Sequence, residues 1–235
     1  MAVCQSGDVV AVEAPGFYGV LQMLEQLELK VIEIPASPTS GMDIRALEES
    51  LQVWDIKACV VSPSFATPTG AVMPSEDRRR LLELADRHDP VSYTLRLGWV
   101  SGGRWHQNIL QLKLTSQLAS SRFLQQGVAS FIAEGGYTSY LRRYRQSLRL
   151  QRDHLLDLLG DWPLPLKATA PQGGLALWVE LPPEVDTLSL YAKTLKEGIV
   201  ITPGSLFSVS GKFSNCLRIS FAHPWNEART DALQR

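Results

Sequence analysis

The sequence has little that would mark a metal site, a disulfide framework or a membrane span. Of its 235 residues only three are cysteine, isolated at positions 4, 59 and 216, and its four histidines form no pair at metal-binding spacing. Isolated cysteines in odd number favour a reducing compartment, so we expect a cytoplasmic protein. No apolar run approaches the ~18 residues that a membrane span needs, so no membrane partner is predicted.

The chain also lacks an excess of either charge. It carries 23 Lys and Arg against 24 Asp and Glu, for a formal net charge of −1. This balance argues against a chain built throughout to wrap nucleic acid, and leaves room only for a local basic patch. Hydrophobic residues make up 45% of the sequence, enough to build the core of one or two domains.

The first part of the chain alternates between short apolar runs and stretches with helical periodicity. Such alternation predicts a parallel sheet with right-handed crossovers, and the continuous apolar runs indicate a sheet covered on both faces. The expected strands are Asp8–Glu13, Lys30–Ile34 and Lys57–Val61; the expected helices are Phe17–Leu27, one capped by Asp43 and one capped by Ser75.

Beyond Arg96 the pattern changes to long helices followed by an α+β tail. The expected helices are Trp105–Ala133, Tyr137–Leu159, Thr187–Glu197 and Asn226–Leu233, and the expected strands are Leu97–Val100, Leu175–Leu181, Ile199–Thr202 and Cys216–Phe221. The sequence therefore predicts an α/β fold with two domains. Residues 1–135 would form an incomplete major domain with a mainly parallel sheet, and residues 136–235 a smaller α+β domain.

Two arginines stand within apolar strands, Arg96 in LRLGWV and Arg218 in CLRISF. A buried guanidinium keeps its charge and must be paired. Each is either half of a structural ion pair or part of an anion site, and the sequence alone leaves these alternatives open. The stretch FATPTG, Phe65–Gly70, follows a predicted parallel strand at the end where ligands bind in open α/β sheets.

A group of five arginines crowds the helix predicted over Tyr137–Leu159. They suit nucleic-acid binding or a solvated helix face, and the second reading is favoured because apolar residues recur between them at helical spacing. On that reading the arginines face water and the apolar stripe is buried. The arginines are Arg142, Arg143, Arg145, Arg149 and Arg152, and the stripe is Tyr137, Leu141, Tyr144, Leu148 and Leu155.

Seven stretches that cover nearly the whole chain are informative in combination. They are GDVVAVEAPGFYG, VIEIPASPTSGMDIRALEE, VVSPSFATPTGAVMPSEDRRRLLELADRHD, LRLGWV, PQGGLALWVELP, GIVITPGSLFS and CLRISFAHP. Together, and in the family's order, they resemble the fold type I pyridoxal-5′-phosphate (PLP) aminotransferases of class I and II. They most resemble the aminotransferase-like domain of MocR/GntR-type transcriptional regulators.

The resemblance implies that segments are absent from this chain. In the family, a strand with an Asp for the pyridine nitrogen and a segment with the Schiff-base lysine lie between counterparts of LADRHD and LRLGWV. Here PVSYT alone separates the two, so a few dozen residues are expected to be absent between Asp89 and Pro90. The family's phosphate-binding Gly-rich loop and the winged-helix DNA-binding domain are likewise expected upstream of Met1.

The family's binding residues carry over at four positions. Phe17 matches the aromatic that stacks on the PLP ring, and Thr67 takes the place of an Asn that bonds the ring oxygen. Arg96 matches the Arg that grips the cofactor phosphate, and Arg218 the Arg that holds a substrate carboxylate. None of the seven lysines stands in the Schiff-base motif, so no catalytic residue and no metal ligand is assigned.

The resemblance implies PLP as cofactor, an amino-acid-like or PLP-related ligand, a homodimer, and DNA contact only through the upstream domain. Without the lysine, the chain as printed is expected to be inactive in transamination. Three hypotheses follow: a PLP-binding effector domain of a regulator, a free-standing aminotransferase for an α-amino acid, and a non-catalytic structural module in which Arg96 and Arg218 only pair with acids.

Overall fold

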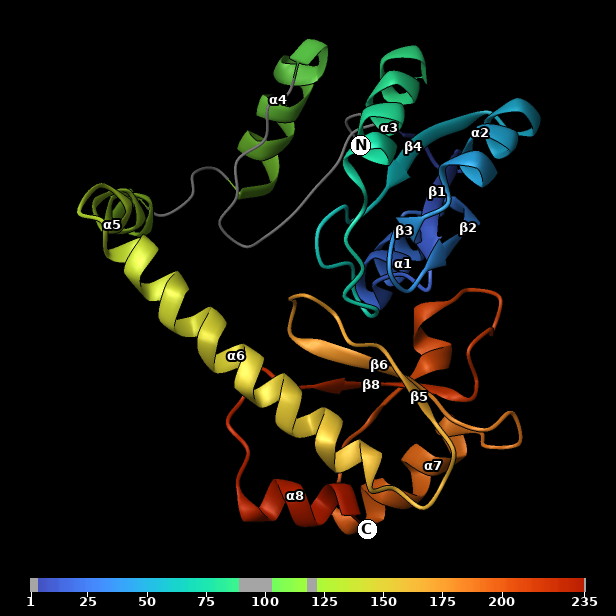
Figure 1. Cartoon of the computed structure of the whole chain (residues 1–235). Helices are drawn as coiled ribbons and strands as arrows, with labels where there is room; N and C mark the ends of the chain where they lie inside the picture. Colours follow the sequence, from blue (N-terminus) through green and yellow to red (C-terminus); the bar gives the residue numbers. More distant parts are fainter. Residues whose placement is uncertain (1–3, 89–102, 118–121, 235) are drawn as a thin grey trace.

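The computed structural model describes residues 4–88, 103–117 and 122–234 and holds two four-stranded sheets (Figure 1). The first half of the chain forms β1 (Val9–Ala14), α1 (Tyr18–Gln26), β2 (Lys30–Ser37), β3 (Gly41–Met42), α2 (Ile44–Val53), β4 (Ile56–Val60) and α3 (Ser75–His88). The second forms α4 (His106–Gln117), α5 (Arg122–Ala133), α6 (Gly136–Gly160), β5 (Lys167–Ala168), β6 (Ala176–Glu180), α7 (Thr187–Thr194), β7 (Thr202–Pro203), β8 (Cys216–Ser220) and α8 (Glu227–Gln234). Three 3₁₀ turns are η1 (Gly103–Trp105), η2 (Leu195–Glu197) and η3 (Gly204–Phe207).

The first sheet is the mainly parallel one that the strand–helix alternation predicts. Its order is β3-β2-β1-β4, with β1 parallel to β2 and β4, and only β3 antiparallel. Helices α2 and α3 cover one face and α1 the other, which explains why the strands are largely apolar. The buried residues are Ala11, Ile34, Leu47 and Leu84 on the first face and Val10, Val12, Leu21 and Leu24 on the second.

The second sheet is antiparallel, in the order β5-β6-β8-β7. One face packs on the second half of α6, where Leu155 and Leu159 are buried against Leu177 and Leu217. The opposite face carries Trp178 and points toward the first sheet, because the strands alternate their side chains between the two faces. Figure 1 shows α6 running from α5 down along this sheet.

Several predicted boundaries need correction. Ser75 is the first residue of α3 rather than its cap, since the Pro74 carbonyl accepts the Arg78 N–H. The strand predicted at Ile199 begins only at Thr202, because Ile199 N–H still donates to Thr194 O at the end of the preceding helical segment. The predicted strand Leu97–Val100 and Arg96 lie outside the described residues.

The buried stripe predicted along α6 is present only in its second half. Leu155 is fully buried, but Tyr137 is 45% exposed and Leu148 only half-buried. The reason is that the second sheet reaches only the second half of α6. In the first half the apolar residues share their side of the helix with arginines, so the predicted separation of the two faces is wrong there.

Asp43 caps α2 as the sequence predicts. Its Oδ1 accepts the N–H groups of Arg45 (2.9 Å) and Ala46 (3.2 Å). Asp43→Ala is expected to lower the free energy of unfolding by about 1 kcal/mol, because two helix N–H groups lose their acceptor. Urea unfolding measures this, with the exposed Glu49→Ala in the same helix as control. Equal effects of both substitutions would contradict a capping role.

Candidate functional site

Phe17 lies at the corner where β1 turns into α1. Pro15 and Gly16 follow the strand, and Phe17 is the N-cap residue of the helix. Its ring lies over the first helical turn, where a Cβ on Gly19 would come 2.8 Å from Phe17 Cε1. The side chain stays 46% exposed, which leaves aromatic surface open to a flat ligand.

Thr67 lies in the loop after β4, at the carboxyl end of the parallel strands. Arg78 of α3 holds this loop by donating from Nε to Met73 O (2.9 Å) and from Nη2 to Pro63 O (2.6 Å). Thr67 is half-buried, and its hydroxyl makes no hydrogen bond within the described part of the chain. A fixed loop therefore presents a hydroxyl that can serve a ligand.

Arg218 is half-buried on β8, directly opposite Trp178 of β6. Its Nε is buried without a hydrogen-bond partner, and it forms no ion pair with any residue that the structure describes. Burial lowers the pKa of the guanidinium, and Tyr18 nearby offsets part of that effect. An arginine without an acid partner does not fit a purely structural ion pair, and it is suited to an anionic ligand.

An aromatic cluster joins the Phe17 corner to the Arg218 strand. The Tyr18 ring packs edge-on against Phe207 at 5.6 Å, and Phe207 packs against Trp178 at 5.3 Å. Gly16 N–H also donates to Phe207 O at 2.9 Å. The structure thus brings two of the predicted site residues into one neighbourhood through Tyr18, which sequence reasoning missed although it stands beside Phe17.

Glu13 links the ends of β1 and β4 and was also missed. It is buried, and its Oε2 accepts the Ser62 N–H at 2.9 Å while Oε1 has no partner among the described residues. Burial raises the pKa of this carboxyl to about 7, and the nearby backbone N–H groups of Ser62 and Met42 lower the pKa by a smaller amount. The sequence feature that could have revealed Glu13 is an acidic residue at the end of the apolar run DVVAVE.

Glu33 of β2 ties the first sheet to the segment after η3. Its carboxylate accepts the Val209 N–H at 2.6 Å and the Ser210 hydroxyl, and Lys212 Nζ lies 3.7 Å away. Burial alone would raise the pKa of Glu33, but hydrogen bonds from Ser210, Ser208 and Val209 outweigh it and lower the pKa. The carboxylate is therefore held in its charged form at the junction of the two sheets.

Comparison with known proteins shows the family of the chain. The model of the family described as aminotransferase class I and II matches residues 1–92 and 89–235, which together span the chain. The chain belongs to the aminotransferase class I and II family. Its α/β fold is that of the fold type I aminotransferases.

Members of this family that resemble the chain include regulators and enzymes. It is 35% identical to the uncharacterized HTH-type transcriptional regulator YjiR of Escherichia coli, covering 100% of this chain and 58% of YjiR. It is 26% identical to aromatic-amino-acid aminotransferase 1 of Thermococcus litoralis, covering 97% of this chain and 66% of that enzyme. The kynurenine aminotransferase of Pyrococcus horikoshii, solved in complex with PMP, superposes with a TM-score of 0.83 at 25% identity, covering 99% of this chain and 69% of that one.

The family match divides where the sequence predicts a break. The two matched stretches meet at residues 89–92, around the expected seam at Asp89–Pro90. The alignment with YjiR runs over 279 positions although this chain supplies only 235 residues, so 44 positions of the alignment have no residue of this chain. A difference of this size agrees with the few dozen residues expected to be absent.

Proposed function

We propose that this chain is the PLP-binding, aminotransferase-like effector domain of a MocR/GntR-type transcriptional regulator. The observation that carries the proposal is its 35% identity to an HTH-type regulator over the whole chain. Because the chain spans 58% of that relative, we assign DNA binding to a separate winged-helix module. We expect the effector domain to act as a homodimer and to take an amino-acid-like or PLP-related ligand.

The described residues fit part of this cofactor. Phe17 offers aromatic surface for the ring, and Thr67 offers a hydroxyl that makes no hydrogen bond within the described residues. Arg218, whose buried Nε has no partner among these residues, is suited to the carboxylate of an amino-acid-like ligand bound beside the cofactor. PLP, when bound, supplies an electron sink for reactions at the α-carbon of an amino acid. Arg96, assigned to the phosphate, lies outside the described residues.

The lysines do not fit covalent attachment of the cofactor. None of the seven stands in the family's lysine motif; Lys57 is paired with Asp55, and Lys212 lies beside Glu33. We therefore propose that the chain holds PLP-type compounds without a covalent bond and does not transaminate. A free-standing aminotransferase is the second candidate, favoured by the 26% identity to the Thermococcus litoralis enzyme.

A binding experiment distinguishes these functions. The probe is N-(5′-phosphopyridoxyl)-L-leucine, the compound complexed with an aminoadipate aminotransferase of Thermus thermophilus. We expect saturable binding of this probe by calorimetry. After incubation with PLP and borohydride, we expect no stoichiometric covalent adduct in the intact mass. An adduct at a single lysine with amino-group turnover would favour the enzyme, and no binding of the probe would contradict the proposal.

A further inference from the structure

Four of the five arginines between Gly136 and Arg152 of α6 form no ion pair with any acid that the structure describes. From Gly136 to Arg152 the helix has five arginines and no acidic residue. Arg152 donates to Pro171 O (2.8 Å) and to Asp153. Arg145 and Arg149 have no hydrogen bond or ion pair within the described ranges. Like charges four residues apart on a helix repel, so a bound anion would stabilise this stretch.

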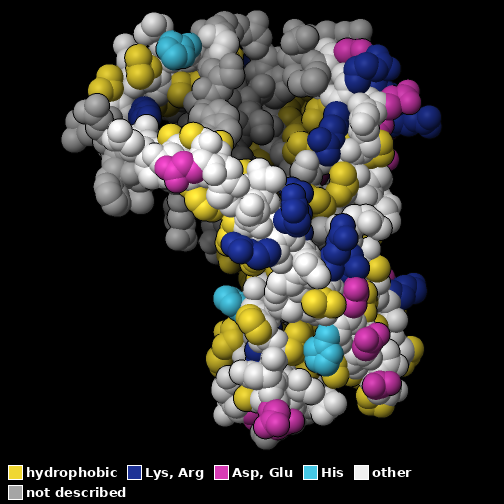
Figure 2. Space-filling model, turned by 60° about the vertical axis from the view of Figure 1, so that its left-hand side comes forward, with side chains coloured by type: hydrophobic (Ala, Val, Ile, Leu, Met, Phe, Trp, Pro, Cys, Tyr) yellow, Lys and Arg dark blue, Asp and Glu magenta, His cyan; other side chains and the backbone are white. Residues whose placement is uncertain are grey.

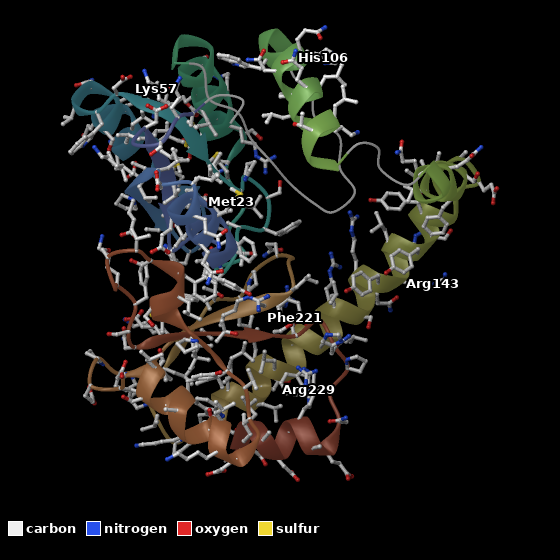
Figure 3. The ribbon with its side chains drawn as sticks, turned by 180° about the vertical axis from the view of Figure 1, so that it is seen from behind. Met23, Lys57, His106, Arg143, Phe221 and Arg229 are labelled. Atoms are coloured by element: carbon white, nitrogen blue, oxygen red, sulfur yellow. The ribbon has the colours of Figure 1, made fainter. Side chains whose placement is uncertain are left out.

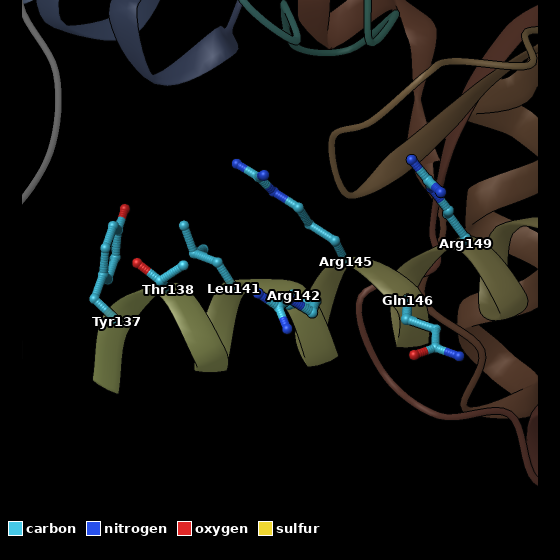
Figure 4. Close-up of a pocket in the computed structure, with 7 residues that line it drawn as sticks. All are labelled: Tyr137, Thr138, Leu141, Arg142, Arg145, Gln146 and Arg149. Atoms are coloured by element: carbon cyan, nitrogen blue, oxygen red, sulfur yellow. The ribbon is translucent and has the colours of Figure 1, made fainter. Parts of the chain in front are cut away.

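Arg145 and Arg149 project from the same side of α6 into a cavity. Figure 4 draws a neighbouring pocket that shares Leu141, Arg145 and Arg149 with this cavity, and it shows both arginine side chains on the same side of α6. Figure 2 shows Lys and Arg gathered along this part of the surface. The cavity has a volume of about 250 Å³. Phe65, Tyr144 and Phe221 form part of its largely apolar wall. Arg152 also borders the cavity but is paired with Asp153, which leaves Arg145 and Arg149 as its two arginines without an acid partner in the described residues.

The wall opposite α6 is fixed by the close approach of two glycines to neighbouring side chains. A Cβ on Gly173 would come 2.3 Å from Phe65 Cε1, and a Cβ on Gly70 would come 2.5 Å from Pro171 Cβ. Arg152 of α6 holds Pro171 from the other side. The loop after β4 and the turn before β6 are thus packed against each other, and the cavity between them and α6 is preformed.

We propose that this cavity is a second anion site, which binds a small carboxylate with an aromatic or branched aliphatic body. Two guanidinium groups suit a carboxylate, and the aromatic wall suits the apolar body. A volume below that of drug-sized pockets limits the ligand to a small organic acid. The site goes beyond the proposed function, because it requires neither the cofactor nor a lysine.

This site is separate from the one at Arg218. Arg218 lies three residues before Phe221, about 10 Å along the strand at ~3.3 Å per residue. Its side chain is on the face of the second sheet that carries Trp178, whereas Phe221 lies where that sheet meets α6 (Figure 3). A ligand at Arg145 and Arg149 is therefore expected to bind whether or not Arg218 is present.

Calorimetry with 3-phenylpropionate tests the proposal on the full chain. We expect the double variant Arg145→Gln/Arg149→Gln to weaken binding at least 10-fold, roughly 1.4 kcal/mol or more, because both charge-assisted contacts are lost. Arg143→Gln is the matched control, since Arg143 is an exposed arginine of the same helix that does not border the cavity. The neutral 3-phenyl-1-propanol should bind much more weakly to the unmodified protein.

A second readout separates binding from folding. Removing the repulsion between Arg145 and Arg149 should leave the melting temperature of the ligand-free double variant unchanged or higher at low salt. The rise in melting temperature that 3-phenylpropionate gives the unmodified protein should disappear in that variant. Equal weakening by Arg143→Gln, retained binding in the double variant, or no binding to the unmodified protein would each overturn the site.

Discussion

Replacement of Arg218 by glutamine is expected to weaken the binding of N-(5′-phosphopyridoxyl)-L-leucine about 100-fold, roughly 2.7 kcal/mol. The buried guanidinium has no acid partner in the described structure, so its charge is available to the carboxylate of the ligand. Loss of one member of a partly buried charge pair leaves the other without compensation, which is why the effect is large. Arg218→Lys keeps the charge but not the planar pair of donors, and should weaken the binding of this ligand about 10-fold.

The control for Arg218 is a second ligand. Pyridoxamine 5′-phosphate carries the ring and phosphate but no carboxylate, so its affinity should be the same in the unmodified protein and in Arg218→Gln. Equal weakening for both compounds would mean that Arg218 supports the fold of the site and does not hold the carboxylate. The melting temperature should not fall in the variant, because burial of this unpaired cation opposes folding.

The sequence predicts the elements of both sheets well where they are long and apolar. β1, β4, β6 and β8 appear within one or two residues of their predicted ranges. The two-residue strands β3 and β5 were not predicted, because two residues carry no periodicity and their pairing depends on the neighbouring strand. The strand register that sets Arg218 opposite Trp178 was not predicted either, because it depends on how β6 and β8 pair in the folded protein.

The error along α6 has a similar cause. Leu141, Tyr144 and Leu148 recur at helical spacing, and such a pattern is typical of a buried face. A periodic pattern gives the direction of that face but not what covers it. Here the second sheet covers Leu155 and Leu159, and the earlier part of the stripe borders the cavity.

A second large effect is expected at Glu13 and depends on pH. Burial raises its pKa in the folded protein from 4.5 to about 7, so the folded state binds this proton more tightly than the unfolded chain. The stability that this gives is fully present below pH 4.5 and is lost as the pH rises to about 7. The loss corresponds to about 3 kcal/mol. Glu13→Gln should therefore be more stable than the unmodified protein at pH 8 and similar to it at pH 4.5.

Glu33→Gln provides a control of opposite sign. The pKa of Glu33 is lowered in the folded protein, so its charged form contributes stability above its ordinary pKa. At pH 8 urea unfolding should show Glu13→Gln gaining stability and Glu33→Gln losing it. Parallel pH profiles for Glu13→Gln and the unmodified protein would contradict the assignment. Glu13 accepts a hydrogen bond from Ser62 and so links the end of β1, which leads to Phe17, to the end of β4, which leads to Thr67. Ionisation of the buried Glu13 carboxyl is therefore expected to destabilise the connection between these two parts of the proposed ligand site.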